Sequence, residues 1–258
     1  MPNETSIEKY QQGLTATHEE LFQLILDPDH DFLTLLLKNP ALDEDHLLAL
    51  LKRRDLTAEL INAVYRKKKQ SLSHQLLLAI VRNSNTSGAL VRNLLPQLRL
   101  FELVDICVLP GASPDQKLAA ERAILQRLPT TPLGNKITLA RRGTANIVGE
   151  LLKEGQPQLF DVCLNSPHLK EAAIFQFLRG ATANADTISM VCRHNRWKER
   201  PNLKLAILKN PKTPNIWLTL WLPRLPLQTL KQLQLTFKSL PSKRTLIESE
   251  INKRSGLK

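Results

Sequence analysis

A corner of similar composition recurs along this chain, and it most constrains what the chain can fold into. Residues 209–216 read Lys-Asn-Pro-Lys-Thr-Pro-Asn-Ile, and the same frame fits residues 38–43, 82–87, 127–134 and, more loosely, 164–169. In most of these corners an apolar helical stretch ends at a basic residue and Asn, and a following Pro prevents the helix from continuing. A Ser or Thr then suits the start of the next helix. The anchor positions 39, 83, 128, 165 and 210 follow one another at steps of 44, 45, 37 and 45 residues.

The segments between the corners predict helices throughout. Apolar residues recur at helical spacing, and no sustained apolar–polar alternation predicts a strand. A single helical hairpin cannot bury its own apolar face, so neighbouring hairpins must stack. We therefore predict an all-α fold, a right-handed α-solenoid of stacked helix pairs with a period of about 44 residues.

The same pattern predicts the domain organisation. Residues 1–17 are polar and form a tail or a cap, residues 18–240 form a single helical-repeat domain, and residues 241–258 form a basic capping helix and tail. Within this last part, a break at Leu240-Pro241-Ser242 places the terminal helix at about residues 243–253.

A family resemblance rests on residues 205–214, which read Leu-Ala-Ile-Leu-Lys-Asn-Pro-Lys-Thr-Pro. This stretch resembles the corner of HEAT-like and leucine-rich-repeat-variant bacterial helical repeats, over about residues 30–240. The resemblance implies a stacked helical repeat. Some leucine-rich-repeat-variant proteins carry an N-terminal cysteine cluster for an iron–sulfur centre, but the first cysteine here is Cys107, so that cofactor is not expected.

Residues that commonly carry catalysis or bind metals are sparse. Cys107, Cys163 and Cys192 are widely spaced, which argues against a disulfide framework and favours small buried side chains. The six histidines form no i,i+4 pair, and no glycine-rich phosphate loop or hydrolase motif occurs. We predict no metal site and no cofactor, and a protein that leans away from catalysis.

The charge is concentrated at one end of the chain. Residues 193–258 contain 15 Lys/Arg and 3 Asp/Glu, whereas residues 1–192 contain 21 of each. Such a field attracts acidic partners and does not determine the fold. Because the sequence shows no secretory signal and no apolar run long enough to span a bilayer, we predict a cytoplasmic protein without a transmembrane segment.

The densest basic segment suggests the binding site. Residues 193–200 place four basic side chains around one tryptophan, a combination that suits phosphates and bases. The predicted residues for an acidic partner, protein segment or nucleic acid, are Arg193, Arg196, Trp197, Lys198, Arg200 and Lys204. The alternative is a solvated loop whose tryptophan packs between repeats. Trp217 and Trp221 likewise suit either packing or a stacking platform.

Three functions remain open at this level. The first is a non-enzymatic interaction scaffold that binds an acidic partner through its basic C-terminal surface. The second is a HEAT-like DNA-binding enzyme of the alkylpurine glycosylase kind, in which Trp197, Trp217 and Trp221 would line a groove beside an acid such as Asp186 or Glu199. The third is peripheral attachment to anionic membranes through the terminal helix, whose apolar stripe is narrow. The oligomeric state is not predicted.

Overall fold

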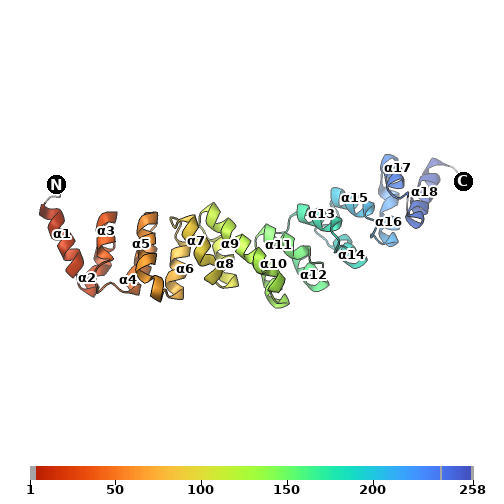
Figure 1. Ribbon diagram of the computed structural model, residues 1–258. Helices are drawn as coiled ribbons and strands as arrows, with labels where there is room; N and C mark the ends of the chain where they lie inside the picture. The colour runs from red at the N-terminus through yellow and green to blue at the C-terminus, as the bar shows by residue number, and fades with distance from the viewer. Residues whose placement is uncertain (1–3, 239, 257–258) are drawn as a thin grey trace. The chain divides into compact units, whose positions relative to one another are not determined.

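Helices make up most of the described chain. The computed structural model describes residues 4–238 and 240–256, and within them it holds eighteen α-helices, four short 3-10 helices and no strand (Figure 1). The predicted all-α class is confirmed. The helices divide into two compact units, Met1–Arg127 and Leu128–Lys258, and we describe each unit by itself. A single domain over residues 18–240 stays a prediction.

The N-terminal unit contains nine α-helices and two 3-10 helices among its described residues. They are α1 (Glu4–Thr15), α2 (His18–Leu24), α3 (His30–Leu36), α4 (Glu44–Leu51), α5 (Ala58–Lys68), η1 (Lys69–Ser71), α6 (His74–Arg82), α7 (Gly88–Leu94), η2 (Leu95–Gln97), α8 (Leu100–Val108) and α9 (Pro114–Arg127). Most of the predicted N-terminal tail is therefore helix α1, which packs on α3. Residues 1–3 of that tail lie outside the described residues.

The C-terminal unit has the same build. Its helices are η3 (Leu128–Thr130), α10 (Leu133–Arg142), α11 (Ala145–Leu152), α12 (Pro157–Asn165), α13 (Glu171–Arg179), α14 (Ala185–Arg193), α15 (Pro201–Lys209), α16 (Asn215–Trp221), η4 (Leu222–Arg224), α17 (Leu227–Thr236) and α18 (Pro241–Ser255). The predicted terminal helix is α18, which is a few residues longer than expected. Of the predicted tail, residues 257–258 lie outside the described range. Along the described chain, no helix is both long and apolar enough to cross a membrane.

Side-chain caps explain why the helices are so numerous and so short. Asp29, Thr57, Ser73, Ser87 and Thr144 each stand directly before a helix and accept a backbone N–H from its first turn. Such a cap satisfies N–H groups that have no partner within the helix. Because start signals follow one another so closely, most helices have only seven to twelve residues, and tertiary packing must supply their stability.

The helices pack on their second neighbours along the chain. In the N-terminal unit α1 packs on α3, α3 on α5, and α4 on α6, while in the C-terminal unit α11 packs on α13 and α13 on α15. The recurring anchors fall after every third helix, at the ends of α3, α6, α9, α12 and α15. The predicted step of about 44 residues therefore covers three short helices rather than one pair, which is a correction to the predicted period.

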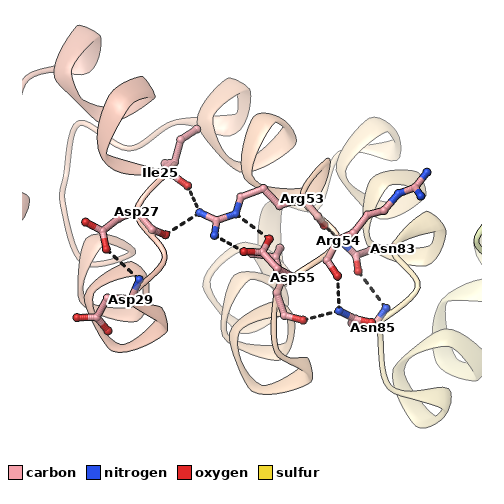
Figure 2. Close-up of polar contacts among 9 residues, drawn as sticks. Ile25, Asp27, Asp29, Arg53, Arg54, Asp55, Asn83 and Asn85 are labelled. Carbon is pink, nitrogen blue, oxygen red and sulfur yellow. Dashed lines mark hydrogen bonds and ion pairs between the residues drawn. The ribbon is translucent and has the colours of Figure 1, made fainter.

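At several helices a side chain ties the end of the helix to the end of its second neighbour. Arg53, after α4, donates from Nη1 to the carbonyl oxygens of Ile25 and Asp27 at 2.6 and 2.7 Å, 28 and 26 residues earlier (Figure 2). Arg127 and Arg254 bond in the same way to carbonyls 29 to 32 residues before them. The last carbonyls of a helix lack intrahelical partners, so these bonds both satisfy them and fix the stacking.

Leucine, isoleucine and valine form the core of both units. The predicted burial of Cys107, Cys163 and Cys192 is confirmed, and all three are free thiols. Burial away from water raises the pKa of each thiol to about 12. They are therefore core residues that stay protonated rather than reactive groups.

A buried histidine joins the starts of α2 and α4. His46 is 0% exposed; its Nε2 lies 2.8 Å from the carbonyl oxygen of His18, and its Nδ1 lies 2.6 Å from Oδ1 of Asp43. Asp43 also accepts the backbone N–H of His46 and pairs with His18 Nε2 at 2.8 Å. Partial burial opposes ionisation of Asp43, but these hydrogen bonds outweigh it and lower the pKa of the carboxyl to about 2.

We expect the Asp43→Asn substitution to destabilise the protein only where the carboxylate is charged. Since the pKa of Asp43 falls from 3.8 to about 2 on folding, its contribution is complete above pH 4 and is lost as the pH falls toward 2. The side chain is 45% exposed, so solvent screening limits the effect to about 1 kcal/mol or less. Urea unfolding of both proteins between pH 2 and pH 7 measures it, and a difference that persists at pH 2 would contradict this origin.

Candidate functional site

The predicted basic segment forms the link between α14 and α15. Arg196 lies in the middle of this link, and its guanidinium donates to the carbonyl oxygens of Ser166 at 2.8 Å and Leu169 at 3.1 Å. These carbonyls follow the end of α12, so Arg196 holds the link between α14 and α15 against the end of α12. Its hydrogen-bonding capacity is largely used within the fold, although part of the side chain stays exposed.

Trp197 makes its contacts within the protein. The side chain is 3% exposed, and its Nε1 donates to the carbonyl oxygen of Leu164 at 3.0 Å. The guanidinium of Arg196 lies over the ring, 4.4 Å from the centroid. The ring is buried in the fold, as the alternative interpretation expected, and a role of Trp197 in binding stays a prediction.

The other predicted residues remain at the surface. Arg193 ends α14 and Arg200 precedes α15, and both are exposed, while Lys198 is half-buried. Lys204 Nζ pairs with Glu199 Oε2 at 3.0 Å, and the hydrogen bond and charge of Lys204 lower the pKa of that carboxyl. Of the six predicted residues, Arg193, Lys198 and Arg200 are the ones left to meet a partner.

None of the three tryptophans lines the groove between α13 and α15, a groove bounded by Phe175, Leu205 and Lys209 among others. Trp221 is 7% exposed, and Trp217 is half-buried with its Nε1 donating to Ser189 Oγ at 3.0 Å. The two rings lie 5.5 Å apart and pack on each other. Trp197 and Trp221 therefore serve packing, whereas part of the Trp217 ring stays at the surface.

A groove lies between α13 and α15, and none of the six predicted residues is part of its lining. Its volume is about 590 Å³, and it opens at the C-terminal ends of the two helices. Phe175, Leu205 and Ala206 give it an apolar floor, and Arg179 and Lys209 stand at its edge. A surface that combines apolar side chains with cations suits a ligand that carries both apolar and acidic groups.

The cations of this groove lack acidic partners. No Asp or Glu is among its lining residues, and over the described part of the chain no ion pair or side-chain hydrogen bond is found for Arg179 or Lys209. Both side chains are exposed. The sequence predictions missed these two residues, although Lys209 belongs to the recurring corner at residues 205–214 and could have been found there.

The recurring corner itself is a hydrogen-bonded structure. Asn210 is buried; its Nδ2 donates to the Leu178 carbonyl at 2.7 Å, and its Oδ1 accepts the Lys212 backbone N–H at 2.8 Å. Lys212 Nζ donates to the carbonyls of Ala181 and Ala183 at 2.8 and 2.7 Å. Asn210 and Lys212 thus supply hydrogen-bond donors to the carbonyls at and after the C-terminal end of α13. Arg179 and Lys209 are not needed to satisfy these carbonyls.

One cluster in the described chain could offer ligand atoms to a metal. It consists of His18, Asp43 and His46, whose ligand atoms lie within 4.8 Å of one another. The hydrogen bonds that join these three residues account for their closeness, and His46 uses both ring nitrogens in them. The cluster therefore has a structural explanation at the α2–α4 contact.

Comparisons with known proteins place no relative beside this chain. No family model matches it, no curated protein matches it, and no solved structure matches it. The groove and its charges thus carry the functional argument.

Proposed function

We propose that this chain is a non-enzymatic helical-repeat scaffold that binds an acidic partner through the basic surface of its C-terminal unit. The observation that carries the proposal is the groove between α13 and α15, where Arg179 and Lys209 stand over an apolar floor without an acidic neighbour in its lining. The unit around it contains 21 Lys/Arg and 8 Asp/Glu, so the wider field also attracts negative charge.

The proposal includes the stacking of the helices as an α-solenoid, with the right-handed sense expected for helical repeats. Packing between second-neighbour helices and the ties between their ends support it within each unit. Similarity to HEAT-like and leucine-rich-repeat-variant repeats stays a prediction, as does a cytoplasmic location. Stacked repeats present extended surfaces to partners, which fits the role of a scaffold.

Binding of a polyanion is expected to depend on the groove cations. Fluorescence anisotropy with labelled poly-glutamate and with a random DNA duplex should show affinity that falls steeply as NaCl rises from 50 to 200 mM. The pair Arg179→Glu and Lys209→Glu should weaken binding about tenfold or more, because two attractive charges become repulsive.

A matched control uses Lys231→Glu, which reverses an exposed charge on α17 outside the groove. This variant should weaken binding only slightly, because Lys231 contributes only to the overall positive charge of the C-terminal unit. Equal losses in the control and in the groove variant, or binding that ignores salt, would refute the groove as the binding site.

A further inference from the structure

The groove of the C-terminal unit has a counterpart in the N-terminal unit at a constant register. A pocket of about 520 Å³ lies between α4 and α6, and ten of its fourteen lining residues have an equivalent 127 positions later in the lining of the groove between α13 and α15, as Asn210 follows Asn83. The matched apolar residues are Leu48 with Phe175, Leu78 with Leu205, and Ala79 with Ala206. The matched polar residues are Lys52 with Arg179, Arg82 with Lys209, and Gln75 with Asn202.

The hydrogen bonds around the two pockets follow the same register. Asn83 Nδ2 donates to the Leu51 carbonyl at 3.0 Å, as Asn210 does to Leu178, and each Oδ1 accepts the N–H two residues later. Asn85 Nδ2 donates to the carbonyl of Arg54 (Figure 2) and to the carbonyl of Leu56. The equivalent carbonyls 127 residues later are those of Ala181 and Ala183, and Lys212 Nζ donates to both of them. The backbone acceptors as well as the side-chain donors therefore repeat.

In both pockets the ends of the helices are already satisfied. Asn83, Asn85 and Arg53 occupy the carbonyls at the α2 and α4 ends, and Arg53 also pairs with Asp55 at 2.6 Å. Lys52 has no ion-pair partner among the described residues, and Arg82 reaches Asp105 at 3.9 Å, the limit of an ion pair. No Asp or Glu lines either pocket. At the matched positions each pocket thus keeps two cations beside apolar lining residues, while Arg53 and Arg54 also line the N-terminal pocket and Lys212 also lines the C-terminal one.

We infer that the two pockets are equivalent binding sites, each for an extended peptide segment that places a carboxylate beside a large apolar side chain. The inference rests on the proposed function and names its ligand. The carboxylate meets the cation pair, and the apolar side chain covers the floor. The amide of Gln75 or Asn202 can bond the peptide backbone, since it both donates and accepts. A nucleic acid fits less well, because the N-terminal pocket has no aromatic lining residue on which a base can stack.

The test is the stoichiometry of binding, measured by isothermal titration calorimetry on the full chain. The probe is a twelve-residue peptide that alternates glutamate and leucine, compared with peptides that alternate lysine and leucine or glutamate and serine. We expect two glutamate–leucine peptides per chain. The pair Lys52→Ala and Arg82→Ala should remove one site, the pair Arg179→Ala and Lys209→Ala should remove the other, and all four together should remove both.

Controls separate this inference from the proposed function. Lys38→Ala and Lys231→Ala change exposed lysines outside the pockets and should keep two sites, and circular dichroism melts check that every variant is folded.

One site that only the Arg179 and Lys209 pair removes would overturn the equivalence while leaving the proposed function standing. Equal binding of the glutamate–serine peptide would overturn the apolar requirement. Binding of oligo-dT without binding of the peptide would overturn the peptide assignment, and binding of no acidic probe would overturn both proposals.

Discussion

Replacing Trp197 by alanine is expected to lower the free energy of unfolding of the C-terminal unit by about 3–5 kcal/mol. The indole is 3% exposed, and it belongs to the link between α14 and α15, from which it reaches the end of α12. Its removal leaves a cavity and takes away the ring over which the Arg196 guanidinium lies. The Leu164 carbonyl also loses its hydrogen-bond donor at 3.0 Å. Urea unfolding followed by circular dichroism measures the loss.

Two further variants divide this effect into its parts. Trp197→Phe keeps much of the packing but lacks the N–H, so it should cost about 1–3 kcal/mol for the unpaired carbonyl. Lys198→Ala changes the half-buried neighbour and should stay within about 0.5 kcal/mol. If Trp197→Ala weakened binding of an acidic probe and left unfolding unchanged, the ring would belong to the binding surface after all.

The second large effect is expected at the buried corner asparagines. Asn83→Ala leaves the carbonyls of Leu51 and Arg53 and the N–H of Asn85 without their partner, and Asn210→Ala does the same to Leu178 and Lys212. Each substitution should cost about 2–3 kcal/mol, because buried backbone groups lose hydrogen bonds that water cannot replace.

Asn165 provides the matched control for these asparagines. It stands at a recurring anchor of the sequence, but it is exposed: its Nδ2 donates to the Asp161 carbonyl within its own helix at 2.9 Å, and its Oδ1 lies 3.2 Å from Nε2 of His194 in an exposed contact. Asn165→Ala should therefore change the unfolding free energy by about 0.5 kcal/mol or less. Equal losses at Asn165 and Asn210 would show that burial of the asparagine and of its hydrogen bonds is not the cause.

The contrast between these residues shows how far the sequence could predict the fold. The corners at Asn39, Asn83 and Asn210 mark real helix ends whose asparagines are buried, because a side-chain amide there satisfies carbonyls of an earlier helix. At the fourth anchor the sequence pattern is similar, yet Arg196 and Trp197 make the ties to the end of α12. Local sequence indicates where a helix ends, but it does not say which distant side chain will reach that end.

The period shows a related limit. The anchors lie about 44 residues apart, and a period of this length is typical of two-helix repeats. Cap residues such as Thr57 and Ser73 divide that distance into more helices than a pair, and the structure places three in each step. Closely spaced caps were the signal that would have predicted shorter helices.

For the candidate site, charge density was a partial guide. It locates a basic region, but it does not separate cations that tie helix ends, such as Arg196, from cations that have no ion pair among the described residues, such as Arg179 and Lys209. That distinction depends on contacts about 30 residues away in the chain. The register of 127 residues between the two pockets joins linings that each combine residues of two separate helices, and local sequence does not show which helices come together.

Amide hydrogen exchange of the full chain, with and without the glutamate–leucine peptide, tests the central claim most directly. If the two pockets bind acidic, apolar segments, the peptide should slow exchange at residues 48–54 and 75–84 and at residues 175–180 and 202–212, and it should leave other segments unchanged. Protection confined to residues 193–200, or no protection at a saturating peptide concentration, would contradict the account.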